Sequence, residues 1–407
     1  MNTIALVGSG AVAKCFAKKI SRTMGIIDKC IVVTRNEVSG RRTVQEMADK
    51  GVTKELILCD VIDTEAFTNI LVSQDVDLVV NAGSTYCNEP VLNGCLQAGV
   101  SYIDASCAER PGESNAAAPW YQNIEAHYAE AFEEKGLSAI LSIGFDPGVV
   151  NVLSSYAMRN IFNEVHSIDI VDVNDGSHGQ YFATNFDPDV NLREIAEDVV
   201  YWEDGVYKTT ACLTRSIEFN FPGLGTRRLY AVGHDEMHSL PHTLKVKNVR
   251  FWMGFSDQYI QVFTVLKKLG LLSNQEIDVD GQKVVPIRVM RSLLPDPASL
   301  AENYVGQACI GVFMRGLVNG EPMSRFLYSM FDHEQTNHEI GEQAVSYSTA
   351  IPLVTATELF FRGTWVPKRM VHVEQLDPEP FLDLLPKHGI DWRCVDWGGN
   401  NFKECAV

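Results

Sequence analysis

The sequence lacks a long apolar run and lacks an excess of positive charge. No stretch of its 407 residues approaches the roughly 20 apolar residues that a membrane-spanning helix needs, so we expect no membrane partner. Lys and Arg number 34 against 52 Asp and Glu, a formal net charge of −18, which argues against nucleic-acid binding. The acidic balance either helps to attract a cationic ligand or simply keeps the protein soluble.

The sequence also lacks paired cysteines. Its ten cysteines are scattered and none forms a Cys-x-x-Cys pair, so neither a zinc site nor a disulfide framework is predicted, and we expect no metal. Several lie inside apolar runs, where a free cysteine packs as a small hydrophobe. Unpaired cysteines favour a reducing compartment, and the strand-like run that begins at Ile4 argues against a signal peptide. We therefore expect a cytoplasmic protein.

The most informative motif that is present opens the chain. The apolar run Ile4–Val7 breaks into a Gly-x-Gly-x-x-Ala turn that ends at Ala13. In a dinucleotide fold the first glycine permits the tight turn, the second lets the pyrophosphate approach, and the small third residue lets the helix pack on the strand. The N-terminus of the following helix attracts phosphate. We predict cofactor contacts from Gly8, Ser9, Gly10, Ala11 and Val12.

The end of the second predicted strand indicates which dinucleotide binds. The buried run Cys30–Thr34 is followed by Arg35. NAD enzymes usually carry an acidic residue at this position, whereas an arginine suits the 2′-phosphate of NADP. Thr34 and Arg35 therefore predict NADPH as the cofactor.

Residues after the next strands are expected to complete the cofactor site. Ligands of open α/β sheets bind outside the carboxyl ends of the strands, and small residues there let a ligand come close. Asp60 follows the third predicted strand and is expected at the adenosine. The remaining candidates follow the fourth and fifth predicted strands: Asn81, Ala82, Gly83 and Asp104.

The order of predicted elements indicates an α/β fold with two domains. Residues 1–150 alternate strand and helix, which predicts a Rossmann domain with a doubly wound parallel sheet. Partly alternating runs at 168–174, 216–221 and 249–253 predict an α+β substrate and dimerisation domain at 151–345, with a mainly antiparallel sheet. We expect residues 346–407 to pack back onto the Rossmann domain. Since two-fold dimers are the commonest assembly, a homodimer is expected.

Several blocks together resemble a known family. The opening turn, Arg35, Tyr102–Asp104 and Gly144–Gly148 resemble the saccharopine dehydrogenase-like group. Ala183–Pro188, Asn191–Glu194 and Glu374–Phe381 are similar to its carboxynorspermidine (carboxyspermidine) dehydrogenases. The resemblance runs from Met1 to about Trp397, and the later blocks are the more specific.

The resemblance implies an activity in polyamine biosynthesis. Enzymes of this family use NADPH to condense L-aspartate β-semialdehyde with a diamine, either 1,3-diaminopropane or putrescine, which gives carboxynorspermidine or carboxyspermidine. The segment Leu229–Leu240 departs from the acidic, Tyr-containing block expected there. The choice of diamine therefore stays open.

The chemistry of such a reaction selects candidate residues. A primary amine titrates near about 10.4, so a base must remove its proton and an acid must protonate the departing water. The candidates for catalysis are Asp146, His178 and His234. The two histidines are chosen because histidine changes charge near neutral pH. Asp146 and Glu236 would also contact the diamine. The alternative for Asp146 is a plain Asp-Pro-Gly turn.

The aspartyl end of the substrate needs a carboxylate clamp. Arg193 is the first choice because its planar fork holds a carboxylate bidentately; the alternative is a structural salt bridge with Glu194 or Glu197. Asn185 and Asn191 are candidates for amino-acid contacts, or else turn residues.

Two other functions remain open. A saccharopine-type reductase would join a semialdehyde to glutamate, but its site must hold more carboxylates, and the acidic balance argues mildly against it. A non-catalytic NADP-binding sensor would bind the cofactor without the blocks for a substrate.

Overall fold

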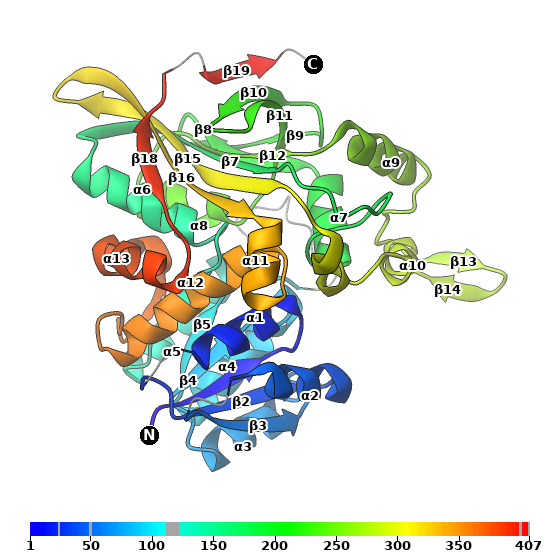
Figure 1. The fold of residues 1–407 in the computed structure, drawn as a ribbon, viewed down its shortest axis with the longest axis vertical. Coiled ribbons are helices and arrows are strands. Elements are labelled where there is room, and N and C mark those ends of the chain that lie inside the picture. Colours follow the sequence, from blue (N-terminus) through cyan, green and yellow to red (C-terminus); the bar gives the residue numbers. More distant parts are fainter. Residues whose placement is uncertain (23–24, 49–50, 111–121, 399–400, 406–407) are drawn as a thin grey trace.

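Two large sheets organise the molecule. The computed structural model describes residues 1–22, 25–48, 51–110, 122–398 and 401–405. Figure 1 shows the N-terminal sheet with its helices in blue and cyan, and the larger sheet at the other end in green and yellow. None of the helices in these described ranges is both long and apolar enough to cross a membrane.

The first sheet is the predicted Rossmann sheet. It is parallel and has the order β17-β6-β5-β4-β1-β2-β3. Its first six strands are β1 Thr3–Val7, β2 Lys29–Thr34, β3 Thr53–Leu58, β4 Leu78–Asn81, β5 Ser101–Asp104 and β6 Ala139–Leu141. The helices between them are α1 Ala11–Ile20, α2 Glu37–Glu46, α3 Thr64–Ser73, α4 Asn88–Ala98 and α5 Gln122–Glu134, with a short turn of helix, η1, at Thr85–Cys87. The fold class predicted from the sequence is confirmed.

Apolar side chains cover both faces of this sheet. Ile4, Leu6 and Val32 face α1 and the long helix α12, Ala344–Phe361, in one core. Ala5, Val7 and their neighbours face α3, α4 and α5 in a second core. Strands buried on both faces explain why the sequence shows unbroken apolar runs rather than alternation.

The second sheet has ten strands and is mainly antiparallel, as predicted. Its main order is β18-β16-β15-β7-β12-β11-β10-β19, with β8 and β9 attached at β12; β7 and β12 pair in parallel. The strands are β7 Glu164–Asn174, β8 Val199–Glu203, β9 Val206–Thr210, β10 Ser216–Phe221, β11 Gly225–Val232, β12 Val249–Gly254, β15 Gln307–Val318, β16 Glu321–Asp332, β18 Arg393–Asp396 and β19 Phe402–Cys405.

Seven further helices and a hairpin surround this sheet. They are α6 Val149–Asn160, α7 Pro188–Ala196, α8 Glu236–Thr243, α9 Asp257–Lys268, α10 Pro286–Leu293, α11 His333–Ile340, α13 Pro378–His388 and the hairpin β13 Ile277–Val279 with β14 Gln282–Val284. In Figure 1 the hairpin and α10 project from the body of the protein.

The C-terminal segment is shared between the two sheets. Residues Met370–His372 form β17, which pairs with β6 and adds a seventh strand to the Rossmann sheet. The sequence placed all of 346–407 on the Rossmann domain. Strands β18 and β19 instead pair with β16 and β10, at the two edges of the larger sheet.

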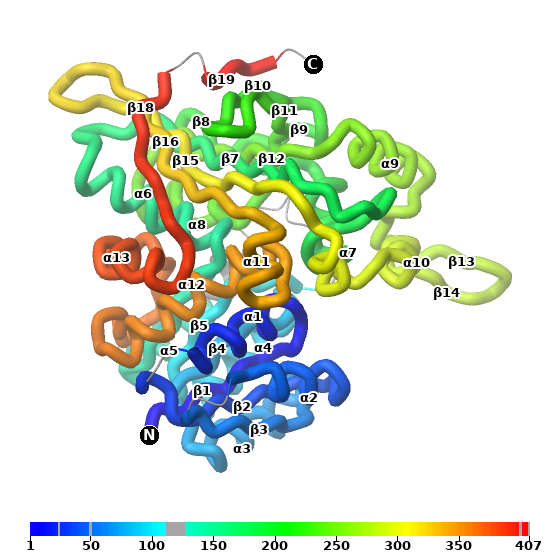
Figure 2. The backbone as a smooth tube through the Cα atoms, viewed as in Figure 1, coloured from blue at the N-terminus to red at the C-terminus, as the bar shows by residue number. Residues whose placement is uncertain are grey.

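The larger sheet curls until this segment closes it. Trp397, between β18 and β19, donates from its indole nitrogen to the Asn220 carbonyl on β10 (3.1 Å) and from its backbone nitrogen to Ser324 on β16 (3.3 Å). In Figure 2 the red strands β18 and β19 lie at these two edges, beside β16 and β10. The curl encloses a core in which aromatic residues such as Phe219, Phe313 and Phe326 pack with aliphatic ones.

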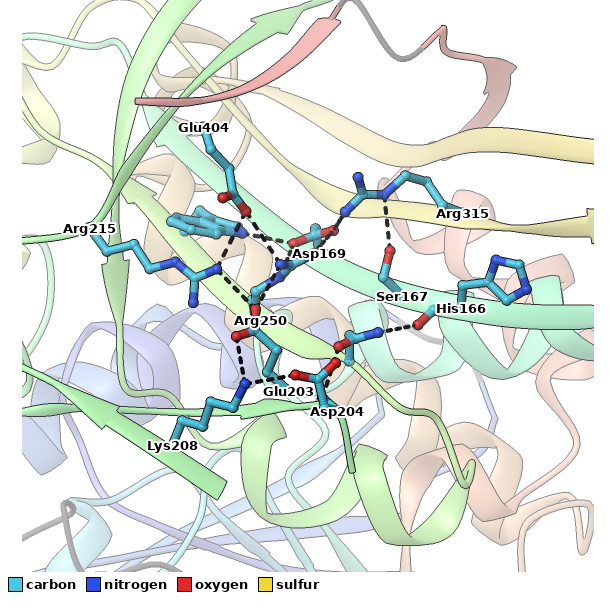
Figure 3. A network of polar contacts seen from close by, with 12 residues as sticks. His166, Ser167, Asp169, Glu203, Asp204, Lys208, Arg215, Arg250, Arg315 and Glu404 are labelled. Carbon is cyan, nitrogen blue, oxygen red and sulfur yellow. Dashed lines mark hydrogen bonds and ion pairs between the residues drawn. The ribbon is translucent and has the colours of Figure 1, made fainter. Parts of the chain in front are cut away.

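A charged network fastens β19 to the sheet (Figure 3). Asp169 on β7 is fully buried and accepts from Nε and Nη2 of Arg250 (2.8 and 3.1 Å) and from Nη2 of Arg315 (2.8 Å). Burial alone would raise the pKa of Asp169, but the two guanidinium groups outweigh burial and lower it. Glu404 of β19 pairs with the same Arg250 (3.4 Å), so the last strand is tied to a buried charge.

Candidate functional site

The glycine turn has the geometry of a dinucleotide cradle. Gly8 has φ +107°, and a Cβ there would lie 2.8 Å from the Ala82 carbonyl oxygen, so only glycine fits. Gly10 caps α1, and a Cβ at Gly10 would meet no atom within 4 Å. The space beside Gly10 at the helix N-terminus therefore suits a pyrophosphate.

The residues predicted to select NADP lie at one edge of this cradle. Ser9 Oγ contacts Thr34 Oγ1 (2.9 Å) and Ser39 Oγ (2.6 Å), which links the glycine turn to α2. The Arg35 side chain is 75 % exposed, and its nearest acidic oxygen, on Asp60, is 3.7 Å away. This loosely held guanidinium is available to a phosphate, and Asp60 lies against Arg35.

Two other candidates point into the domain. Asn81 donates to Asn88 Oδ1 (2.8 Å) and to the Tyr102 hydroxyl (3.1 Å). Asp104 accepts from the Ser142 backbone and from Asn88 (3.4 Å), and burial raises its pKa to about 7. These two side chains support the strand ends, while the backbone of Ala82 and Gly83 lies over Gly8.

An imidazole surrounded by carboxylates lies beyond the Rossmann strands. His234 Nδ1 is 2.6 Å from Glu236 Oε2, and its ring stacks on Phe251 with centroids 3.9 Å apart. Glu236, at the start of α8, is fully buried, and its Oε1 has no hydrogen-bond partner. Burial alone would lower the pKa of His234, but Glu236 and its other acidic neighbours raise it well above the ordinary value. The acidic surroundings therefore favour the protonated form of His234.

Asp146 and Asp172 face this pair from two other elements. Asp146 lies between β6 and α6, where the chain passes from one domain to the other, and Asp172 lies on β7. Burial is the largest cause that raises the pKa of each, and each also feels Glu236. The pKa of Asp172 rises to about 7, and the Asp172 charge raises that of Asp146 further. The free site is short of positive charge.

Arg193 adds a guanidinium near these acidic residues. It lies on α7, is 7 % exposed, and forms an ion pair with Glu109, which is 5 % exposed and comes from the Rossmann domain after β5. Glu197 is 3.8 Å from the same guanidinium. The sequence offered Glu194 or Glu197 as the salt-bridge partner of Arg193. The tighter partner in the structure is Glu109.

Glu194 connects Arg193 to the imidazole. Its Oε2 is buried without a hydrogen-bond partner. Burial raises its pKa to about 8, and among its electrostatic neighbours are His234, Glu109 and Arg193. The charges therefore run from one guanidinium through Glu194 to the carboxylates around His234.

The remaining predicted residues lie in neighbouring networks. The Tyr304 hydroxyl donates to Asn185 Oδ1 (2.7 Å), and the His178 ring meets the Tyr304 ring edge-on at 5.2 Å. Burial lowers the pKa of His178. Asn191 accepts from the Tyr259 hydroxyl (3.1 Å). The structure thus gathers Asp146, His234 and Glu236, and places His178, Asn185 and Asn191 in separate contacts.

Sequence analysis missed Asp172, Glu109 and Tyr304. Asp172 had a signal, because alternation in 168–174 places it on the same face as the core residues Ile168 and Ile170. An acid on a core-facing position calls for an explanation. Glu109 gave no local signal, since its partner is 84 residues away. Within the described ranges, no three His, Cys, Asp or Glu side chains are arranged to hold a metal ion.

Comparison with known proteins identifies relatives along the whole chain. Residues 4–140 match the saccharopine dehydrogenase NADP binding domain, and residues 144–390 match the saccharopine dehydrogenase C-terminal domain. The chain is 38 % identical to the carboxynorspermidine synthase of Vibrio alginolyticus, over 95 % of each chain. It is 35 % identical to the carboxyaminopropylagmatine dehydrogenase of a Synechocystis species, over 97 % of this chain and 98 % of that one.

A solved structure shares the fold. Saccharopine dehydrogenase (L-Glu forming) from Saccharomyces cerevisiae superposes with a TM-score of 0.69 at 13 % identity, covering 98 % of this chain and 100 % of that chain.

Proposed function

The chain belongs to the saccharopine dehydrogenase family of NADP-binding oxidoreductases, and from this premise we propose that it condenses L-aspartate β-semialdehyde with a diamine. The amine nitrogen attacks the aldehyde carbon, and loss of one water leaves an imine. A hydride and a proton then reduce the C=N bond to a secondary amine. The product, carboxynorspermidine or carboxyspermidine, would serve polyamine biosynthesis.

The order of charges in this buried group carries the proposal. Such a product has one carboxylate at one end, followed by amino groups along the rest of its length. Here Glu194 interacts electrostatically with Arg193 on one side and with His234 on the other, and His234 interacts with the carboxylates of Glu236 and Asp146. A saccharopine-like product carries more carboxylates and would call for more cations than these.

Each group has a role in this scheme. Arg193 binds the carboxylate of the semialdehyde, and Glu236 with Glu194 attracts the ammonium groups. Burial raises the pKa of both Asp146 and Asp172, that of Asp172 to about 7, so these carboxylates can take the proton from the attacking amine. His234, whose pKa its acidic neighbours raise, protonates the departing water. His178, Asn185 and Asn191 support the walls.

The cofactor would be NADPH, which supplies the hydride when bound. The open space at Gly10, the glycine-only turn at Gly8 and the exposed Arg35 fit its pyrophosphate and 2′-phosphate.

The relatives leave the amine to be decided by experiment. The name of one relative refers to carboxynorspermidine, and that of the other to an agmatine derivative. Putrescine and 1,3-diaminopropane are the proposed substrates, and agmatine is the third amine to test.

The test is oxidation of NADPH by the purified protein, followed by loss of reduced-nicotinamide absorbance. L-Aspartate β-semialdehyde is combined with each amine in turn, and each component is omitted in a control. Oxidation that requires both aldehyde and amine supports the proposal, and the amine with the highest kcat/KM names the product. Oxidation with glutamate in place of any amine, using aminoadipate semialdehyde, would replace the proposal with the saccharopine-type alternative.

A further inference from the structure

Three arginines in this chain bind carboxylates through the same edge. Arg250 donates from Nε and Nη2 together to Asp169, Arg227 does so to Asp175 (2.9 and 2.8 Å), and Arg110 does so to Glu89 (both 2.8 Å). In each case the two parallel N–H groups match the two carboxylate oxygens.

Arg193 uses only half of that edge. Its Nη2 pairs with Glu109 Oε2, but its Nε is buried and has no hydrogen-bond partner. Because an unmet donor inside a protein costs free energy, this Nε needs an acceptor. A carboxylate lying across Nε and Nη2 would satisfy it, and that carboxylate would have to displace Glu109 from Nη2.

Glu109 is placed to be displaced. It belongs to the Rossmann domain, whereas Arg193 belongs to α7 of the other domain, so no helix or strand fixes one to the other. Among the described residues, the charged and titratable groups that act on Glu109 are Asp235, which precedes α8, Glu194 and Glu197, both on α7, Tyr86 of η1, and Arg193 itself. Tyr86 of η1 lies under the guanidinium, 6.0 Å from it.

We propose that Glu109 is a positioning residue that occupies Arg193 in the free protein and is replaced by the substrate carboxylate, which binds across Nε and Nη2. This inference rests on the proposed function, since it assigns the carboxylate site of the same group of residues. Glu109 keeps the guanidinium in place before binding and leaves it when the amino-acid substrate arrives.

Displacement has a consequence for protons. Burial raises the pKa of Glu109 to about 7, and Arg193 works against this rise. Once a ligand carboxylate takes the guanidinium, Glu109 loses its cation and its pKa rises further. Binding therefore takes up a proton, so the ligand binds more tightly at low pH and more weakly as pH increases.

The test is calorimetric titration with L-homoserine, an alcohol analogue of the semialdehyde that cannot form an imine. Wild-type affinity should fall between about pH 6 and pH 8, approaching a tenfold loss per unit above the Glu109 pKa. Glu109→Gln should bind more tightly at pH 8 and lose this dependence. Glu197→Gln, which removes the other carboxylate near the same guanidinium, is the matched control and should keep the dependence.

Two further measurements keep the test decisive. Circular dichroism and thermal unfolding verify that Glu109→Gln is folded, and Glu109→Asp, which retains the charge, should retain the pH dependence. An unchanged dependence in Glu109→Gln overturns the inference. L-Glutamate is titrated in parallel. If Glu109→Gln removes the pH dependence of binding for L-glutamate alone, the inference stands but the semialdehyde is withdrawn as the substrate. Absence of binding by both probes overturns the inference, and the NADPH assay judges the proposed function separately.

Discussion

Arg35 shows how one side chain can set cofactor choice. Because its guanidinium is exposed and only loosely paired with Asp60, Arg35→Ala should fold normally and weaken NADPH binding by about tenfold or more, the value of one charge-assisted contact. NADH binding should change little. Fluorescence titration with both cofactors measures the difference. Arg41→Ala is the control, since Arg41 pairs with Glu37 on α2; equal losses for NADPH and NADH would remove the 2′-phosphate argument.

Asp172 gives a pH prediction at the same scale. As proton acceptors, Asp146 and Asp172 must be ionised, so kcat/KM should fall as pH drops through about 7. Asp172→Asn removes a negative charge that raises the pKa of Asp146, so this acid limb should move to lower pH by about one unit. The pH profile of kcat/KM measures it. Glu218→Gln, at an exposed pair with Arg228, should leave the limb in place, and an unmoved limb in Asp172→Asn would exclude the pair as the base.

Single residues could be predicted where their partners are near in sequence. The turn at Gly8 and Gly10 and the Arg35 position are local patterns of this kind. The sequence named His234 and Glu236 separately, and the structure pairs them. For Arg193 the sequence offered Glu197, which lies 3.8 Å away on the same helix, but it missed the tighter partner Glu109. Sequence spacing reveals i,i+4 neighbours but not a carboxylate in the other domain.

At the scale of elements, the two glycines of the turn between β1 and α1 have different roles: Gly8 is needed for folding and Gly10 for binding the cofactor. Gly8→Ala would force a Cβ to within 2.8 Å of Ala82 and place it at φ +107°, which should cost about 1–3 kcal/mol of stability. Gly10→Ala meets no atom and keeps an ordinary extended conformation, so it should unfold at the wild-type temperature yet bind NADPH poorly. Thermal unfolding and NADPH titration test both. Normal NADPH binding by Gly10→Ala would contradict a pyrophosphate at that position.

Elements were predictable where one pattern dominates. The Rossmann strands are short apolar runs between helices, and 168–174, 216–221 and 249–253 all lie in strands. The paired strands β15 and β16 were missed. Most of β15 is buried on both faces and carries Gly311 and Gly316, so it shows neither alternation nor strong strand propensity. Strand β17 has three residues, too few for any pattern.

At the scale of the whole molecule, the segment 397–407, which closes the larger sheet, should affect the stability of that domain but not the binding of NADPH. Removing residues 397–407 deletes β19, Trp397 and the Glu404 contact with Arg250. Loss of the buried aromatic contacts should destabilise the larger domain by about 3 kcal/mol or more. NADPH binding should persist, since the cradle lies on the other sheet. Thermal unfolding with and without NADPH measures both. An unfolding temperature unchanged by the deletion would show that this segment does not stabilise the larger sheet.

The homodimer expected from the sequence stays a prediction about the whole molecule. We expect light scattering after size-exclusion chromatography to give twice the chain mass of 45.2 kDa. A mass of one chain at micromolar concentration would contradict it.

Because β17 and the closing segment come late in the chain, they also set the order in which the protein can be made. At the translation rates of cells, about 5–20 residues per second, the first domain waits many seconds for Met370–His372 to add its seventh strand. The larger sheet waits longer still, because β18 and β19 follow β17 in the chain. A growing chain that has not yet reached β17 therefore carries two unfinished sheets at once.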